Sequence, residues 1–118
     1  MAEIKKITIY HNPRCSKSRQ ALALLVENAV EPIIVEYLKS PYTKEQLRTL
    51  CKKLNMRAQD LIRKNETVYK ERFADSELSE EEWIDAMVTH PILVERPIIE
   101  NANTAVVGRL GGARKIPD

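Results

Sequence analysis

The spacing of apolar residues changes several times along this chain. Residues 4–10 alternate with a period of two and are rich in β-branched side chains, which predicts a strand. Pro13 ends that pattern, because proline cannot donate a hydrogen bond in a central strand. From Ser16 onward the apolar positions, Leu22, Leu25, Val26 and Ala29, have the spacing of one helix face. Residues 33–37 predict a second strand, so the chain begins with a β-α-β unit whose strands are parallel.

Two capping boxes mark helix starts in the middle of the chain. Residues 43–46 and 79–82 each place a threonine or serine three positions before a glutamine or glutamate. Residues 57–73 carry shorter helical patterns. The helix that follows Ser79 should end at His90, because a proline restricts the residue before it.

The end of the chain predicts two short strands, residues 97–99 and 104–107, joined by an asparagine-containing turn. The order β-α-β, helices, β-β matches the thioredoxin arrangement. We therefore expect an α/β protein with a thioredoxin-like fold: a four-stranded mixed sheet flanked by helices. Residues from about 40 to 90 would form a helical insert between the β-α-β half and the C-terminal β-hairpin. The length of 118 residues favours a single domain covering residues 1–118.

Composition narrows the function classes. With 19 basic and 17 acidic residues the net charge is +2, too balanced for a nucleic-acid-binding domain. No apolar run is long enough to span a membrane, and the first residues lack the apolar core of a signal peptide, so we expect a cytoplasmic protein. Two cysteines are too few for a disulfide framework or a structural zinc site, and no metal site is expected.

The two cysteines differ in their surroundings. Cys51 shares an apolar helix face with Leu47, Leu50 and Leu54. A thiol in apolar surroundings has a raised pKa and is chemically inert. We therefore expect Cys51 to be a buried structural residue, with a role as a resolving thiol as the less favoured alternative.

Cys15 lies between the first strand and the first helix, where α/β folds place their ligands. Free amides and the helix dipole favour an anion at a helix start, either a thiolate or a bound oxyanion. Arg14, Lys17 and Arg19 add positive charge, and Ser18, three residues on, is expected to bring its hydroxyl to the sulfur. Each of these features lowers a thiol pKa, so Cys15 is the predicted nucleophile.

Spacing around Cys15 excludes two chemistries. Ser18 replaces the second cysteine of a C-x-x-C redox motif, so any disulfide exchange would use one thiol. Ala21 stands where a phosphatase-type C-x5-R loop needs arginine. His11, four residues before Cys15, fits two roles equally: an ion pair with the thiolate, or a hydrogen bond to nearby backbone.

Four segments carry a specific combination of motifs: IYHNPRCSKSR at 9–19, YLKSP at 37–41, LIRKN at 61–65 and HPILVERPI at 90–98. Together they resemble the arsenate reductase (ArsC) family that uses glutathione and glutaredoxin. The likeness runs from Ile7 to about Arg109, and it is closest to the short, YfgD-type members.

The resemblance implies roles for six residues. The catalytic cysteine of the family matches Cys15, and the residues that tune its thiol match His11 and Ser18. The oxyanion-binding arginines of the family match Arg63, Arg96 and Arg109, which by spacing alone would be ordinary surface residues. A thioredoxin-like sheet also implies a cis peptide bond before Pro97, since cis bonds are essentially confined to X-Pro.

The resemblance further implies reduction of arsenate to arsenite through a Cys15–arsenic adduct that glutathione and glutaredoxin resolve. No bound cofactor is expected, and glutathione would be a co-substrate. Two alternatives remain. One is a monothiol, glutathione-dependent thiol/disulfide oxidoreductase. The other is a non-enzymatic Spx-like regulator that binds RNA polymerase, which the HNP motif at 11–13 together with Arg63 and Arg96 disfavours.

Overall fold

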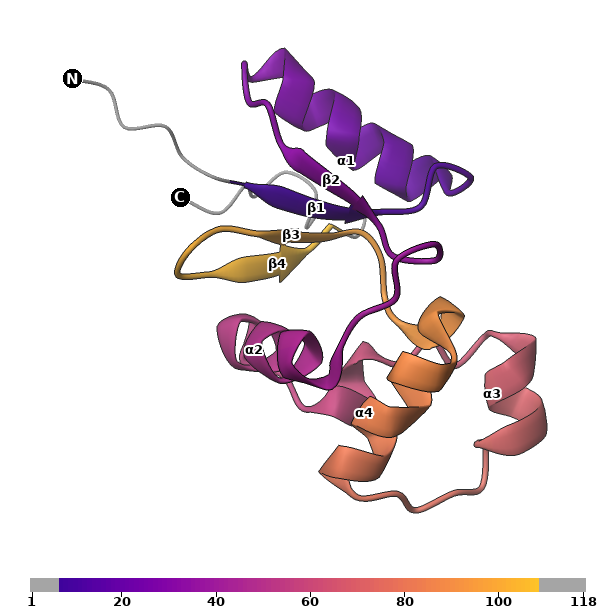
Figure 1. The fold of residues 1–118 in the computed structure, drawn as a ribbon. Helices are drawn as coiled ribbons and strands as arrows, with labels where there is room; N and C mark the ends of the chain where they lie inside the picture. The colour runs from indigo at the N-terminus through magenta and orange to yellow at the C-terminus, as the bar shows by residue number, and fades with distance from the viewer. Residues whose placement is uncertain (1–6, 109–118) are drawn as a thin grey trace. The chain divides into compact units, whose positions relative to one another are not determined.

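The computed structural model describes residues 7–108, and the chain divides into two compact units. The sheet unit comprises residues 7–40 and 96–108, and the helical unit comprises Pro41–Glu95 (Figure 1). Of the residues singled out above, Arg109 and residues 4–6 of the predicted first strand lie outside the described part of the chain. Cys15 and Arg96 belong to the sheet unit, and Arg63 belongs to the helical unit.

The sheet unit contains the expected four-stranded mixed sheet, with strand order β2-β1-β3-β4. Its strands are β1 (Thr8–His11), β2 (Ile33–Glu36), β3 (Ile98–Glu100) and β4 (Ala105–Val107). The first two strands are parallel, and the other neighbours are antiparallel. The N-terminal β-α-β unit and the C-terminal hairpin are both confirmed.

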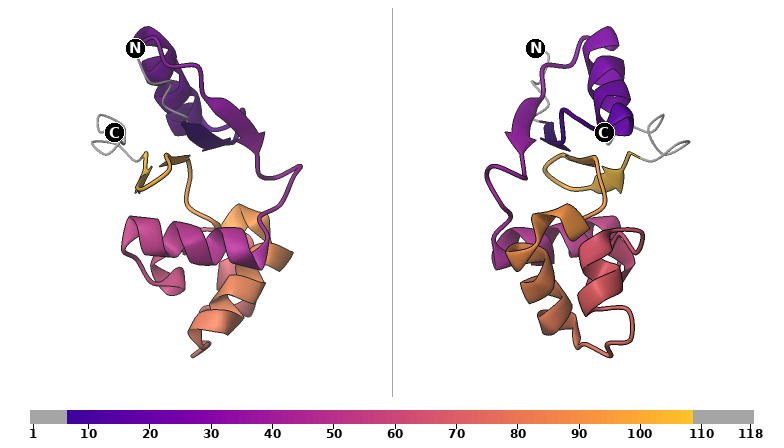
Figure 2. Two further views of the ribbon diagram at one scale, coloured as in Figure 1. Left: turned by 60° about the vertical axis from the view of Figure 1, so that its left-hand side comes forward. Right: turned by 90° about the vertical axis from the view of Figure 1, so that its right-hand side faces the viewer.

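One face of this sheet is covered by α1 (Ser16–Glu27), as both views in Figure 2 show. Alternation along β1 turns Ile9 toward the helix, and its partners across the sheet are Ile34 of β2 and Ile99 of β3. The buried cluster at this interface consists of Ile7, Ile9, Ala21, Leu25 and Ile99. This packing fixes the start of α1, and therefore Cys15, at the end of the central strand β1.

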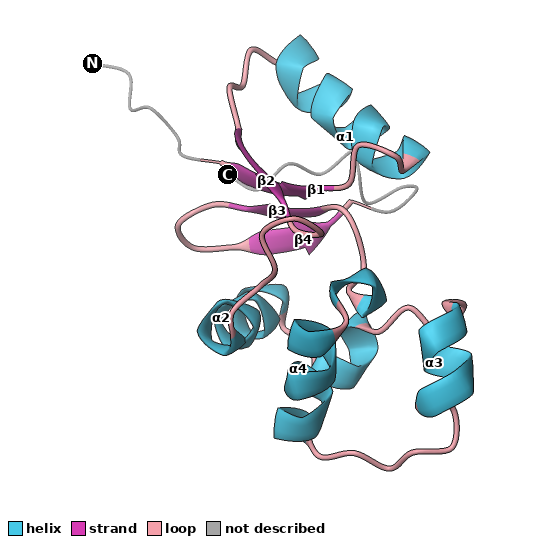
Figure 3. Ribbon diagram, turned by 45° about the vertical axis from the view of Figure 1, so that its right-hand side comes forward, coloured by secondary structure: helices cyan, strands magenta, loops and turns pink. Residues whose placement is uncertain are grey.

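Within residues 41–95, the named elements of the helical unit are all helices (Figure 3). Its elements are α2 (Lys44–Leu54), η1 (Ala58–Leu61), α3 (Thr67–Arg72), α4 (Glu80–Thr89) and η2 (Pro91–Leu93). Both predicted capping boxes form. The Thr43 hydroxyl accepts from the Gln46 amide at 3.1 Å, and the Ser79 hydroxyl accepts from the Glu82 amide at 3.2 Å.

Several boundaries differ from the predicted ones by a few residues. The first strand runs from Thr8 through His11, because its last residue still pairs with Glu36 of β2. Tyr37 and Pro97 lie outside the strands, whose ends depend on which partner residues are in register. The peptide bond between Arg96 and Pro97 is cis, which confirms that prediction.

We expect Leu25→Ala to destabilise the protein by about 3 kcal/mol, because Leu25 is fully buried beneath the sheet and its removal leaves a cavity. Urea unfolding followed by circular dichroism measures the change. Val26, its neighbour on α1, is 61% exposed and provides the control, since Val26→Ala should change the stability by no more than about 0.5 kcal/mol. Equal effects of the two substitutions would contradict the packing described for α1.

Candidate active site

A short turn after β1 brings Cys15 to the start of α1. The side-chain oxygen of Asn12 accepts a hydrogen bond from the amide of Arg14 at 3.0 Å, and its carbonyl accepts one from the amide of Cys15 at 3.0 Å. These bonds form an Asx turn, a geometry that asparagine favours. Cys15 therefore becomes the N-cap residue of α1, with extended backbone angles of φ −94° and ψ 124°.

The sulfur of Cys15 lies beside the first amides of the helix. Its side chain makes no regular capping hydrogen bond, and the first turn of α1 contains no acidic residue. Partial burial acts to raise the pKa of the thiol, but the amides of Ser18 and Lys17 and the guanidinium of Arg96 outweigh it. The net result is a Cys15 pKa below its ordinary value.

A buried hydrogen-bond chain supports this helix start from behind. Ser18 is fully buried, and its hydroxyl lies 2.6 Å from Nδ1 of His11. The same hydroxyl oxygen accepts a hydrogen bond from the backbone amide of Asn12 at 3.0 Å. The chain ties the end of β1, the Asx turn and the first turn of α1 to one another.

His11 is 6% exposed, and this burial lowers the pKa of its imidazole. The carboxylate of Glu36 opposes the shift, and the guanidinium of Arg19 adds to it. A histidine with a lowered pKa is mostly neutral at pH 7. The structure shows the ring bonded to the Ser18 hydroxyl. A direct effect of His11 on the thiolate stays a prediction.

The positive charge at the sulfur comes from a distant residue. Arg96, which follows the helical unit in sequence, lowers the Cys15 pKa both by its charge and by a side-chain hydrogen bond. Arg19, expected to act on the sulfur, instead donates to the Pro13 carbonyl at 3.0 Å. The sheet unit thus brings together Cys15, His11, Ser18 and Arg96.

Arg63 lies in the helical unit, directly after η1. Its backbone amide donates to the carbonyl of Leu93 at 2.7 Å, and the neighbouring residues Ile62 and Val94 form an isolated β-bridge. Its guanidinium pairs with Glu66, with 2.8 Å between Nη2 and Oε2. Arg63 is therefore held by specific contacts within its own unit, unlike an ordinary surface arginine.

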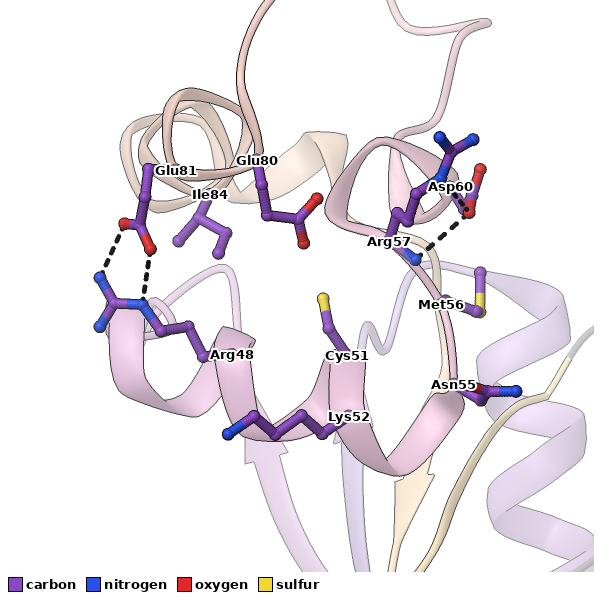
Figure 4. A pocket seen from close by; sticks show the side chains of 10 residues that line it. All are labelled: Arg48, Cys51, Lys52, Asn55, Met56, Arg57, Asp60, Glu80, Glu81 and Ile84. Atoms are coloured by element: carbon purple, nitrogen blue, oxygen red, sulfur yellow. Dashed lines mark hydrogen bonds and ion pairs between the residues drawn. The ribbon is translucent and has the colours of Figure 1, made fainter.

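Cys51 has opposite surroundings to Cys15. It lies on α2, is 6% exposed, and its sulfur points toward the carboxylate of Glu80 (Figure 4). Burial, followed by the charges of Glu80 and Asp60, raises the pKa of this thiol to about 11. The contrast between the two thiols agrees with the different roles expected for them.

The site around Cys15 can supply a nucleophilic thiolate next to cationic and N–H donors. Such a combination suits attack on an electrophile that carries negatively charged oxygens. Between residues 7 and 108 there is no group of three or more histidine, cysteine or acidic side chains arranged to hold a metal ion. Over the same residues, no helix has both the length and the apolar character needed to cross a membrane.

Two contributing residues escaped the sequence reasoning. Asn12 builds the Asx turn, and the Asn-Pro pair at 12–13 is a recognised signal for turn initiation. Glu66 pairs with Arg63 across the turn before α3, where the charge-pair spacing of helices does not apply, so no sequence signal marked the pair.

Comparisons of sequence and of structure with known proteins all find relatives of the same family. The sequence matches the ArsC family over residues 10–111. It is 53% identical to the Escherichia coli protein YfgD over 107 residues, covering 89% of this chain and 90% of that protein. It is 40% identical to an arsenate reductase of Haemophilus influenzae, covering 87% and 90%. The structure of an arsenate reductase from Vibrio cholerae superposes with a TM-score of 0.86 at 38% identity, covering 91% and 92%. These structural relatives share the thioredoxin-like fold predicted from the sequence.

We expect iodoacetamide to label Cys15 far faster than Cys51 at pH 7 in the folded protein. The pKa of Cys15 is lowered, whereas a thiol with a pKa of about 11 is ionised in only about one molecule in ten thousand at that pH. Alkylation rate against pH, with the labelled peptides quantified by mass spectrometry, gives both profiles. Faster labelling of Cys51 would contradict the assignment of Cys15 as the nucleophile.

The same measurement on Arg96→Gln tests the source of the shift. Because Arg96 stabilises the thiolate, its loss should move the Cys15 profile to higher pH and leave Cys51 unchanged. Arg14→Gln is the matched control, since Arg14 is an exposed arginine beside Cys15 in sequence. A larger shift in this control would indicate that local charge governs the thiol.

Proposed function

The chain belongs to the ArsC family, and we propose that it reduces arsenate to arsenite with Cys15 as the nucleophile. The observation that carries the proposal is the lowered pKa of Cys15 at the start of α1, beside the Arg96 guanidinium. A thiolate is the reactive form of cysteine, and the neighbouring donors are suited to the oxygens of a tetrahedral oxyanion.

The first step is attack of the Cys15 thiolate on arsenic. A sulfur–arsenic bond forms and one arsenate oxygen leaves as water after protonation, so arsenic remains As(V). The amides of Lys17 and Ser18 lower the Cys15 pKa. Once the sulfur has become neutral, the same amides would stabilise the negative charge on the oxygens of the adduct.

External thiols complete the reaction. Glutathione condenses with the adduct and a second water leaves, forming an arsenic–glutathione bond. The thiolate of glutaredoxin then attacks the glutathione sulfur, and the electron pair of the breaking sulfur–arsenic bond reduces As(V) to As(III). Water releases arsenite from Cys15, and the oxidised product is a glutathione–glutaredoxin disulfide. Both electrons come from thiols, so no step requires a bound cofactor, and the cytoplasm, where these thiols are abundant, is the proposed location.

We assign oxyanion binding to Arg63, Arg96 and Arg109, as in the family. A guanidinium presents a planar fork of N–H donors that matches two oxygens of an oxyanion. Two features support the first two assignments: Arg96 acts directly on the Cys15 sulfur, and Arg63 is held by backbone and side-chain contacts. His11 and Ser18 are assigned to hold the helix start that carries the thiolate.

The principal rival is a monothiol, glutathione-dependent oxidoreductase. It would use the same lowered pKa of Cys15, because a thiolate also attacks disulfides. The substrates separate the two functions. A glutathionylated peptide requires no oxyanion-binding arginines, whereas arsenate does.

Purified protein should turn over arsenate when supplied with glutathione, glutaredoxin, glutathione reductase and NADPH. The oxidation of NADPH measures the rate. Cys15→Ser should lower the rate by at least about a thousandfold, because the hydroxyl is a far weaker nucleophile. Cys51→Ser is the control and should keep nearly full activity, since Cys51 has a pKa of about 11 and is buried. Absence of turnover in the unaltered protein would reject arsenate reduction.

Arg63→Lys and Arg96→Lys should each lower kcat/KM for arsenate about tenfold or more. Lysine keeps the positive charge but loses the fork of donors. Neither substitution should affect reduction of a glutathionylated peptide as strongly, so that activity serves as the comparison. If both variants kept the arsenate activity of the unaltered protein, the oxyanion assignment would be wrong and the monothiol function would be favoured.

A further inference from the structure

Arg63 is attached firmly to the framework of the helical unit. Its amide donates to the Leu93 carbonyl at 2.7 Å, and the Glu95 amide donates to the Leu61 carbonyl at 2.9 Å. Together with the bridge between Ile62 and Val94, these bonds join the segment after η1 to the segment after η2. The backbone position of Arg63 is therefore set by tertiary contacts, and only its side chain remains to be oriented.

The carboxylate of Glu66 provides that orientation. It meets Nη2 of Arg63 at 2.8 Å, while Nη1 of Arg63 donates to the Ile92 carbonyl at 3.4 Å. The two side chains are only 16% and 22% exposed, whereas the Arg48–Glu81 pair of the same unit is 43% and 57% exposed. Water therefore screens the charge of Glu66 less than it screens an ordinary surface carboxylate.

The Glu66 carboxylate is placed where it could cap a helix, but it does not do so. Glu66 is the N-cap residue of α3, yet its side chain makes no capping hydrogen bond. The N-cap residues of α2 and α4, Thr43 and Ser79, both do. A turn in which the Glu66 amide donates to the Arg63 carbonyl at 3.3 Å instead places the carboxylate against the guanidinium.

We propose that Glu66 is a positioning residue that competes with the oxyanion for Arg63. This inference rests on the proposed function, because it takes Arg63 to be an oxyanion ligand. Without an oxyanion, Glu66 occupies Nη2 of Arg63 and holds the guanidinium in place. An arriving oxyanion must displace that carboxylate or share the guanidinium with it, and in either case its affinity is lower than Arg63 alone would provide.

The charge of the ligand gives this competition a distinctive signature. If Glu66 stays near the bound oxyanion, a dianion is repelled about twice as strongly as a monoanion of the same shape. Removing the negative charge of Glu66 should therefore strengthen binding of sulfate more than binding of perchlorate. A substitution that merely loosened the structure would weaken the binding of both ions.

The test is Glu66→Gln, which keeps an oxygen acceptor for the Arg63 guanidinium but removes the charge. We expect the KM for arsenate and the Kd for sulfate, measured by calorimetry, to fall roughly fivefold. The kcat should stay within about twofold, because the interaction affects binding and not the reaction of the thiolate. The gain for perchlorate should be smaller than the gain for sulfate.

Glu71→Gln is the matched control, because Glu71 is an exposed carboxylate on the same helix, α3. It removes the same charge and should change KM and Kd much less. Unfolding curves of both variants check that the fold is intact. An affinity in Glu66→Gln that is unchanged, weakened, or raised no more than in Glu71→Gln would overturn the inference.

The binding measurement also separates this inference from the proposed function. If the unaltered protein fails to reduce arsenate but binds sulfate, and Glu66→Gln binds it more tightly, the competition stands and arsenate reduction fails. If arsenate is reduced but Glu66→Gln behaves as Glu71→Gln does, the competition fails and arsenate reduction stands. Absence of any oxyanion binding overturns the competition.

Discussion

The start of α1 has amide donors that require an acceptor, and the Cys15 sulfur is the N-cap group that faces them. α1 carries no acidic residue in its first turn, whereas α2 and α4 begin with complete capping boxes. A helix start that is left open in this way stabilises negative charge. The proposed nucleophilic role of Cys15 and the proposed binding of an oxyanion both depend on this arrangement.

A stable position for that helix start is as important as its charge. The Asx turn of Asn12 and the hydrogen bonds of the Ser18 hydroxyl join the end of the central strand to the first turn of α1. Leu25 of α1 packs against Ile9 of β1 in one buried cluster, and this packing holds the rest of the helix on the sheet. His11 contributes through a hydrogen bond, and its lowered pKa keeps it mostly neutral, so the cationic contribution at the sulfur comes from Arg96.

The two described arginines assigned to oxyanion binding have different partners. Arg96 stabilises the Cys15 thiolate, so its proposed role in oxyanion binding would place the ligand beside the nucleophile. Arg63 interacts with a carboxylate and is partly neutralised by it. The same side-chain type therefore stabilises a thiolate in one unit and pairs with a carboxylate in the other. The difference lies in which residue the fold places opposite the guanidinium.

The amino-acid sequence alone determined the features that depend on short-range interactions. The alternation in residues 4–10, the helical spacing after Ser16 and the two capping boxes each act within a few residues. Among the described residues, the strands and helices form at these places, with ends that differ by a few residues. The difference between Cys15 and Cys51 was also visible, because a helix start and an apolar stripe are local patterns. Tertiary structure alone decided which charge meets which group. Arg96 reaches the sulfur from 81 positions away, while the nearby Arg19 bonds to a backbone carbonyl. Such pairings depend on strand register and helix packing, which local spacing does not specify.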